Sequence, residues 1–431
     1  MRYLLGNSGS FLTLVAILWV VLTPKLELQA VELLGKNATV VAESDDPEST
    51  LAFNPGLTRL SGGRLLATYN LGKGVVMTSD DSGSSWQERA NFSFRHARPF
   101  SAGDSVYILG HSGDLMIIRS DDLGNSWSRP VNLSEGERWH QAPANVHYAN
   151  GQVYLVMERI DTPDGFDAWP VRHLAPVLMR ASVEDDLTDP DAWTFASELF
   201  FRDAVAVDAI EYFGVPFYPF EPLRRKALAP RRNMSPPGWL EANVIRIVDP
   251  RHYWYDPDGR TVHLYMRAHT GMTNLAAVVK VVERPDGSME TMLERAPSGK
   301  DLVYLPLPGG QMKFHILYDD VSKLYWLLST QSTDSMTRPE FLDRDDGRFG
   351  LADNERHRLQ LHFSRNAVDW NFAGMVAIGE TQRHARHYAS MVIDGDDLRI
   401  LSRSGNAAAQ SAHNTNQITF HTVAEFRDLV Y

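Results

Sequence analysis

Ser79–Trp86 reads SDDSGSSW, and 41 residues later Ser120–Trp127 reads SDDLGNSW. Both stretches follow the pattern Ser-x-Asp-x-Gly-x-Ser-Trp. In each of them the Asp side chain and the Gly favour a tight turn between two strands, and the Trp is expected to pack beneath that turn. Two eight-residue copies at this interval predict a fold that is built from repeated small sheets.

Short apolar runs separated by turn signals surround this repeat. Turns such as Ala149-Asn150-Gly151 and Asp256-Pro257-Asp258-Gly259 stand beside runs such as Arg64–Tyr69 (RLLATY) and Gln152–Met157 (QVYLVM). An Asx-Gly pair between apolar runs is a strong hairpin signal, and few segments keep a helical period for more than a turn or two. The sequence therefore predicts an all-β fold.

The length of the repeat region favours a β-propeller. At about 45–65 residues per four-stranded blade, residues 45–431 hold six to eight blades. Seven blades are preferred and six are also allowed. We expect the last strand, Gln417–Val423, to close the ring by pairing with N-terminal sequence, so that residues 45–431 form one domain. The Pro-rich residues 203–240 break the strand rhythm and are either an insertion over the pocket or a disordered lid.

The N-terminus has the features of a signal peptide. Arg2 precedes the apolar run Phe11–Leu22, which is too short to cross about 30 Å of hydrocarbon comfortably. Cleavage after Ala30 would leave residues 31–44 as a linker. The alternative is an uncleaved N-terminal anchor. Since no later stretch is long and apolar enough to span a membrane, we expect the mature protein to be secreted or periplasmic and free of the membrane.

Charge and cysteine content exclude several classes of function. The chain has 42 Lys and Arg against 54 Asp and Glu, and the resulting net charge of −12 argues against a general nucleic-acid-binding protein. An anionic small substrate is still allowed, because a local basic pocket outweighs the net charge. The absence of Cys excludes a disulfide framework, a thiolate zinc site and a cysteine nucleophile.

The repeat resembles the Asp-box, a turn motif on the outside of the blades in sialidase-like propellers. Trp139–Pro143 (WHQAP), Gly238–Asn243 (GWLEAN), Gly309–Phe314 (GGQMKF) and the tail Arg403–Phe420 further resemble a group of propeller-type polysaccharide lyases and rhamnosidases. Members of that group attack rhamnose–uronate linkages. The resemblance implies a carbohydrate-active enzyme in which His140 acts at the central funnel. A retaining sialidase would also need an Arg before the first blade, where Phe53–Leu57 (FNPGL) has none.

Three residues are candidates for catalysis. β-Elimination next to a uronate needs a base, a group that neutralises the carboxylate, and an acid for the leaving oxygen. His140 suits the first task, and its alternative role is a packed histidine that holds the turn. Tyr212 is a candidate proton donor or acceptor, with Tyr218 and Tyr253 as competitors. Hydrolysis would need two carboxyl groups, for which Glu241 is the best single candidate.

The substrate-binding candidates are polar residues expected near the funnel. Arg267 and Arg403 each follow an apolar run, and arginine binds a carboxylate bidentately. By alternation along its strand, His387 is expected to face the funnel, with Arg386 and Tyr388 on the other side. The complete set is Arg180, Asn243, Arg267, Lys313, His387, Arg403, His413 and Asn416. The His384 and His387 pair is too weak a signal for zinc, so we expect no catalytic metal and no cofactor, while structural Ca²⁺ is allowed.

Three functions are compatible with this reasoning. The preferred one is an exported enzyme that cleaves a glycosidic bond in an anionic, uronate-containing polysaccharide or oligosaccharide, by β-elimination or hydrolysis. The alternatives are a sialidase-type exo-glycosidase and a non-catalytic propeller that binds glycans. A cluster of His, Arg and Tyr in the funnel would favour catalysis over binding, and three Arg converging on one carboxylate would favour the sialidase type.

Overall fold

The computed structural model describes residues 31–35, 38–167, 169–205, 237–269, 273–335, 337 and 355–431. The chain divides into two units, Met1–Glu32 and Leu33–Tyr431. The predicted signal peptide, most of the Pro-rich segment and Tyr212 lie outside the described residues. Among the described residues, no helix has the length and apolar character needed to cross a membrane.

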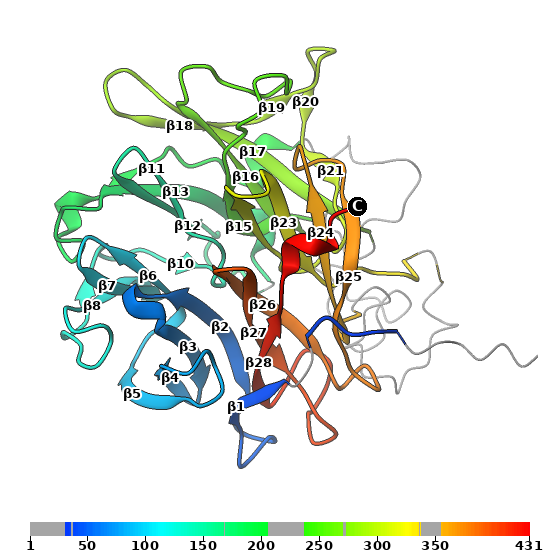
Figure 1. The fold of residues 1–431 in the computed structure, drawn as a ribbon. Helices are drawn as coiled ribbons and strands as arrows, with labels where there is room; N and C mark the ends of the chain where they lie inside the picture. Colours follow the sequence, from blue (N-terminus) through cyan, green and yellow to red (C-terminus); the bar gives the residue numbers. More distant parts are fainter. Residues whose placement is uncertain are drawn as a thin grey trace, which may run out of the picture. The chain divides into compact units, whose positions relative to one another are not determined.

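In the described residues the strands of the second unit form seven antiparallel sheets: six blades, each built on a path of four strands, and one separate two-stranded sheet. The predicted all-β propeller is therefore confirmed, with six blades rather than the preferred seven (Figure 1). Blades 1 and 2 comprise β2 (Ala52–Arg59), β3 (Leu65–Leu71), β4 (Lys73–Ser79), β5 (Gln87–Phe92), β6 (Arg95–Ala102), β7 (Ser105–Ser112), β8 (Asp114–Ser120) and β9 (Val131–Asn132). Blade 3 comprises β10 (Trp139–His140), β12 (Gln152–Ile160), β13 (Leu174–Ser182) and β14 (Thr194–Phe195), with β11 (His147–Ala149) on β12.

The second half of the ring carries the longer connections. Blade 4 comprises β15 (Trp239–Ile245), β16 (Thr261–Ala268), β17 (Leu275–Glu283) and β18 (Met289–Met292), with β21 (Tyr304–Pro306) on β17 and the separate pair β19 (Glu294–Arg295) and β20 (Asp301–Leu302). Blade 5 comprises β22 (His315–Asp319), β23 (Leu324–Ser329), β24 (Arg358–Ser364) and β25 (Asn371–Ile378). Blade 6 comprises β26 (Arg386–Asp394), β27 (Asp397–Ser404), β28 (Gln417–Val423) and β1 (Thr39–Glu43).

Helical structure in the described residues is limited to single turns. These are α1 (Phe201–Ala204) and the 3₁₀ turns Ser61–Gly63, Val171–His173, Pro190–Ala192 and Phe426–Leu429.

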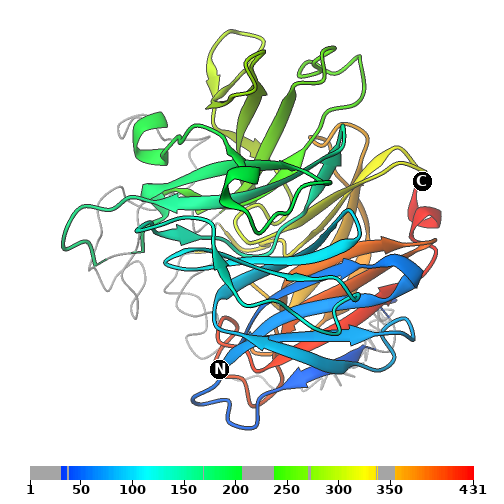
Figure 2. The ribbon, with the colours of Figure 1, turned by 90° about the vertical axis from the view of Figure 1, so that its left-hand side faces the viewer.

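The ring is closed by the pairing of β1 with β28, which are side by side in Figures 1 and 2. The last strand has the predicted bounds, and its partner comes from the segment that was predicted as a linker. Ahead of β1, the backbone N–H groups of Leu34 and Gly35 donate to the carbonyls of Met375 and Val376 in β25. The N-terminal segment is thus hydrogen-bonded to blades 5 and 6.

Apolar side chains fill the space between neighbouring blades. One buried cluster lies between each pair of adjacent blades, and the cluster that joins blade 6 to blade 1 includes Leu65, Tyr69, Leu401 and Phe420. Because each sheet is covered on both faces, its inner strands are apolar almost throughout. The first strands face one another around the axis, where β2 lies against β6 and β26, and β22 lies against β15 and β26.

The two copies of the repeat form the same turn, at the same place in blades 1 and 2. In the second copy Asp122 accepts hydrogen bonds from the hydroxyl groups of Ser120 and Ser126 and from the Ser126 N–H. Trp127 Nε1 donates to the Gly124 carbonyl. Gly124 has a φ of +85°, and a Cβ there would lie 2.6 Å from Leu66 of the preceding blade. The turn therefore connects the third and fourth strands of one blade and also packs against its neighbour.

We expect Asp122→Ala to lower the unfolding midpoint by a few degrees and to leave the site unchanged. The substitution removes the acceptor that holds this turn, and about 1 kcal/mol shifts the midpoint of a large domain by only ~2–4 °C. Thermal unfolding checks this result, with the exposed Asp104→Ala as the control. Equal midpoints for the two variants would mean that the turn contributes nothing to stability.

Candidate functional site

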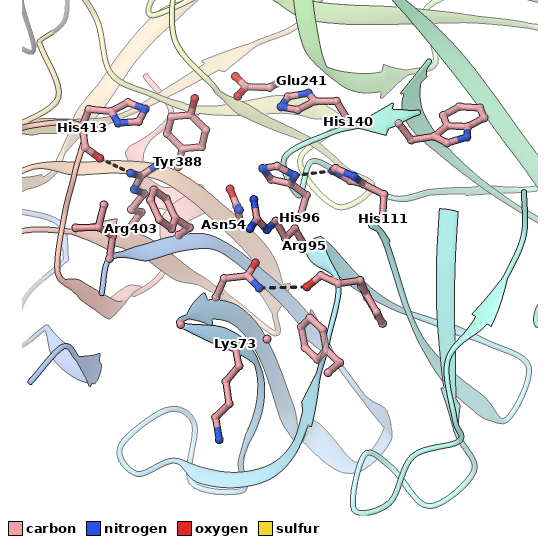
Figure 3. A pocket seen from close by; sticks show the side chains of 18 of the residues that line it. Asn54, Lys73, Arg95, His96, His111, His140, Glu241, Tyr388, Arg403 and His413 are labelled. Carbon is pink, nitrogen blue, oxygen red and sulfur yellow. Dashed lines mark hydrogen bonds between the residues drawn. The ribbon is translucent and has the colours of Figure 1, made fainter. Parts of the chain in front are cut away.

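A cavity of about 930 Å³ opens among the inner strands of the propeller (Figure 3). Its wall includes side chains from blades 1, 2, 3, 4 and 6, and also Arg356, which precedes β24 of blade 5. A cavity of this size accommodates a small sugar ligand. Lys73 and Arg95 line it as well, with both side chains exposed to solvent.

A β-bulge in four inner strands directs a polar residue into this cavity. Asn54, His96, Glu241 and Tyr388 have φ angles of +54°, +55°, +63° and +50°. Each lies where the register of a first strand shifts against the second strand of its blade. All four residues line the cavity. Non-glycine residues in this conformation cost free energy and are concentrated at functional sites, so the repetition marks the cavity as the candidate site.

Three arginines surround the Tyr388 ring. Arg267 Nη1 donates to the Tyr388 hydroxyl oxygen at 2.9 Å. The guanidinium groups of Arg356 and Arg403 lie 5.5 and 5.4 Å from the centre of the ring. All three arginines are buried residues that line the cavity. Burial lowers the pKa of Arg403 to about 10, so its side chain still carries its charge at neutral pH.

Each of these arginines is held by several contacts. Arg403 stacks on Phe53 at 4.2 Å, donates through Nε to Thr415 Oγ1 at 3.1 Å, and donates through Nη2 to the His413 carbonyl (Figure 3). Arg356 Nη1 donates to His387 Nδ1 at 2.8 Å. Burial and the nearby arginines hold the pKa of His387 well below its usual value, so the imidazole is neutral and can accept this hydrogen bond.

Glu241 lies next to this cationic cluster. Its Oε2 is 3.5 Å from Arg267 Nη1, the same nitrogen that donates to Tyr388. The Glu241 side chain is only 2% exposed, and Oε2 has no hydrogen-bond partner in the described residues. A carboxylate and a phenol thus both lie close to one guanidinium nitrogen, Arg267 Nη1.

A second carboxylate connects Glu241 to His140. The Glu158 side chain is fully buried, and its Oε2 accepts from His140 Nδ1 at 2.8 Å while its Oε1 accepts from the Glu241 backbone N–H. Burial raises the pKa of Glu158, and the hydrogen bond from His140 opposes that rise. With Nδ1 bonded to Glu158, Nε2 is the nitrogen of His140 that is left to exchange a proton with a ligand.

Two further imidazoles lie beside His140. His96 Nδ1 and His111 Nε2 are 2.7 Å apart, and the His96 ring centre is 4.9 Å from that of His140. Burial holds the pKa of His96 well below its usual value and lowers that of His111 to about 3. Both rings are therefore neutral at physiological pH. Trp169, 42% exposed, meets the His140 ring edge-on at 5.3 Å.

The cavity brings together five of the residues singled out from the sequence: His140, Glu241, Arg267, Arg403 and His413. Five others make structural contacts outside its lining: Arg180 with Glu283 and Gly287, Asn243 with Phe314 and Ile316, Lys313 with the Ala389 carbonyl, His387 with Arg356, and Asn416 with Asn406. Burial lowers the pKa of Lys313 to about 7.

Sequence reasoning missed Tyr388, Arg356, His96, His111, Asn54 and Trp169. The expectation for the Arg386–Tyr388 segment was wrong, because the bulge puts Tyr388 on the cavity wall and leaves His387 1% exposed behind it. A signal existed for His96. Arg95–Pro99 (RHARP) precedes Trp139–Pro143 (WHQAP) by 44 residues, with His and Pro at matching positions. In the described part of the chain, no three His, Asp or Glu side chains are grouped to hold a metal ion.

Comparison with known proteins shows the fold. No family model and no curated protein matches the chain. Among solved structures, a protein of unknown function from Dyadobacter fermentans is 12% identical with a TM-score of 0.50, covering 92% of this chain and 100% of that one. The intramolecular trans-sialidase from Ruminococcus gnavus is 10% identical (TM-score 0.49, 93% and 100% covered). An α-L-arabinanase from Penicillium chrysogenum is also 10% identical, with a TM-score of 0.48, and the match covers 91% of this chain and 99% of that one. The resemblance to rhamnose–uronate lyases stays a prediction.

Asn243→Ala should destabilise the protein without changing the site. Asn243 Nδ2 donates to the Phe314 carbonyl and its Oδ1 accepts from the Ile316 N–H, so the side chain joins blade 4 to blade 5. Loss of both bonds in a buried position should cost about 2 kcal/mol or more. Urea denaturation measures this cost, with the exposed Asn91→Ala as the control. A stable variant with impaired ligand binding would instead place Asn243 in the site.

Proposed function

We propose that the protein cleaves the glycosidic bond of a sugar that carries a carboxylate. The observation that carries this proposal is the set of three buried arginines, Arg267, Arg356 and Arg403, around one tyrosine in a sugar-sized cavity. Guanidinium groups bind carboxylates through paired, charge-assisted hydrogen bonds, and these bonds are strongest where water is excluded. A neutral sugar has no anionic group that could form such paired bonds with the arginines.

The reaction that this geometry favours is hydrolysis with Tyr388 as the nucleophile. Its oxygen would attack the anomeric carbon while Glu241 takes the phenolic proton, and His140 Nε2 would protonate the departing oxygen. His140 Nε2 would then take a proton from a water molecule that attacks the anomeric carbon, the bond from that carbon to the Tyr388 oxygen would break, and Tyr388 would recover its proton from Glu241. Tyrosine nucleophiles are known in sialidases. This role is supported by the position of Tyr388 and Glu241, which both lie close to one nitrogen of Arg267. Phe53–Leu57 lacks the arginine that a sialidase would have there, and in this proposal Arg403 from blade 6 takes its place in binding the carboxylate.

β-Elimination from a uronate is the second candidate, and the bond from His140 to Glu158 favours it. A neutral His140 would remove the proton next to the carboxylate through Nε2. The electron pair would form the C4–C5 double bond and expel the glycosidic oxygen, which would take its proton from Tyr388. The arginines would stabilise the charge that develops on the carboxylate. Both reactions therefore use the same anion site and the same two proton-bearing groups.

A panel of uronate polysaccharides and sialosides separates these reactions. Unsaturated products absorb near 235 nm and identify elimination, while new reducing ends or free sialic acid without that absorbance identify hydrolysis. Cleavage of neutral glycans only would contradict the proposal. Silence on the whole panel, together with measurable binding of an anionic glycan, would establish a binding protein instead.

Tyr388→Phe should lower kcat by about 10³-fold or more while the melting temperature stays within a few degrees. The change removes one oxygen that is a nucleophile in hydrolysis and an acid in elimination, and it keeps the ring against Arg356 and Arg403. The matched control is Tyr253→Phe, because Tyr253 is 88% exposed and does not line the cavity. If Tyr388→Phe keeps its activity, neither mechanism holds.

His140→Ala and Arg403→Lys should fail in different ways. Loss of a positioned proton-transfer group costs about 10²–10⁴ in kcat with little change in ligand binding. Arg403→Lys keeps the charge but loses the paired hydrogen bonds, so it should mainly raise KM. Steady-state kinetics and isothermal titration distinguish the two. If the His140→Ala protein is unstable but fully active per folded molecule, His140 stabilises the fold and does not transfer a proton in the reaction.

A further inference from the structure

The two sides of the large cavity differ in chemical character. The buried arginines Arg267, Arg356 and Arg403 come from blades 4 to 6, whereas blades 2 and 3 contribute three histidines and an exposed tryptophan. In Figure 3, His140 and its two neighbouring imidazoles lie apart from Tyr388 and Arg403. The volume of about 930 Å³ is at the upper end of the range of about 300–1,000 Å³ that holds drug-sized ligands. The cavity therefore has room for more than the one sugar that the arginines would bind.

Trp169 is an exposed apolar side chain in the wall formed by blades 2 and 3. It belongs to the loop between β12 and β13, lines the cavity, and is 42% exposed. Its ring centre is 5.3 Å from that of His140, and the two ring planes meet at 81°. Keeping apolar surface in water costs free energy. An indole that stays open beside a polar site is therefore a candidate contact for a ligand.

Residues on both sides of Trp169 are held by contacts with the fold. Val171, two positions later, is fully buried in the cluster between blades 3 and 4. The Pro170 carbonyl accepts from the His173 N–H at 2.7 Å, and the Phe166 ring meets the His173 ring edge-on at 4.7 Å. An aromatic side chain that is fixed in this way loses little conformational entropy when a ligand stacks on it.

His140 connects Trp169 to the proposed reaction. In hydrolysis His140 Nε2 protonates the departing oxygen, so the sugar that leaves with this oxygen lies next to the His140 ring, where Trp169 is found. The other imidazoles on this side, His96 and His111, are buried and neutral, and they can exchange single hydrogen bonds with sugar hydroxyl groups. The cations that line blades 1 and 2 are exposed to solvent, which screens their charge. They are Lys73 and Arg95.

We propose that Trp169 binds the sugar ring on the leaving-group side of the cleaved bond, and that this second sugar is uncharged. The C–H groups on one face of a pyranose are apolar and can pack against the large aromatic surface of an indole. The substrate is then an oligosaccharide or polysaccharide in which the carboxylated sugar is linked to a neutral one. This inference rests on the proposed function in its hydrolytic form, because elimination would place the leaving oxygen at Tyr388.

Ligand titrations test this contact separately from cleavage. Two pairs of probes share an acidic sugar and differ in the neutral group attached to it: methyl α-sialoside with 3′-sialyllactose, and methyl β-D-glucuronide with cellobiouronic acid. In a Tyr388→Phe background, which should not cleave them, we expect the larger member of one pair to bind about tenfold more tightly. Adding Trp169→Ala should remove that gain and leave the affinity for the methyl glycoside unchanged within about twofold. Trp169→Phe should retain part of the gain.

Phe372→Ala is the matched control and should keep the full gain, because Phe372 is 47% exposed and does not line the cavity. Equal affinities within both pairs, no binding of any probe, or a gain that survives Trp169→Ala would overturn the inference. So would an equal loss of affinity for the methyl glycoside, since Trp169 would then only support the rest of the site. A Trp169-dependent gain in a protein that cleaves no glycan would contradict the proposed function and retain the contact with the second sugar.

Discussion

The pairing of β1 with β28 is the constraint on which the rest of the molecule depends. It joins strands from opposite ends of the sequence, and it completes blade 6 so that Leu401 and Phe420 pack against Leu65 and Tyr69 of blade 1. Without this closure, blade 1 would expose an apolar face and blade 6 an unpaired edge. Since Arg403 and Tyr388 come from blade 6 and Phe53 and Asn54 from blade 1, the same closure also builds one wall of the cavity.

Inside the closed ring, the bulges convert a packing scaffold into a polar site. A regular first strand would place alternate side chains into the inter-blade core, and polar groups would have to replace apolar ones there. A local shift of register at Asn54, His96, Glu241 and Tyr388 lets these residues project toward the axis while their neighbours stay packed. The positive φ angles of these residues are strained. Such a conformation persists only where the surrounding structure fixes it, as the neighbouring sheets do here.

The fold was more predictable from the sequence than the site, for physical reasons. Strand alternation and the Asp-Gly turns are local, so the bounds of β28 and the turn positions follow directly from Gln417–Val423 and the two repeats. The number of blades does not, because the connections between strands differ in length and no local signal fixes how many residues one blade takes. Arg267 and Arg403 were singled out because each follows an apolar run, and His140 because the stretch Trp139–Pro143 resembles a propeller motif. Tyr388 was misplaced because alternation fails at a bulge, and bulges leave no clear sequence signal.

The chain has a net charge of −12, yet several buried side chains near the ring axis are cationic. This distribution reconciles the negative net charge with the proposed anionic ligand. Exposed carboxylates act through water, and at physiological ionic strength their effect falls off over about 8 Å. Arg98, Arg403 and Lys313 are nearly inaccessible to solvent, so their field is screened much less where a ligand binds. The net charge of −12 thus disfavours binding of nucleic acid, whereas in the proposed function the buried cations select the small molecules that bind inside the ring. Under the proposed function, selectivity for anions follows from where the charges are buried, and the total charge has little influence on it.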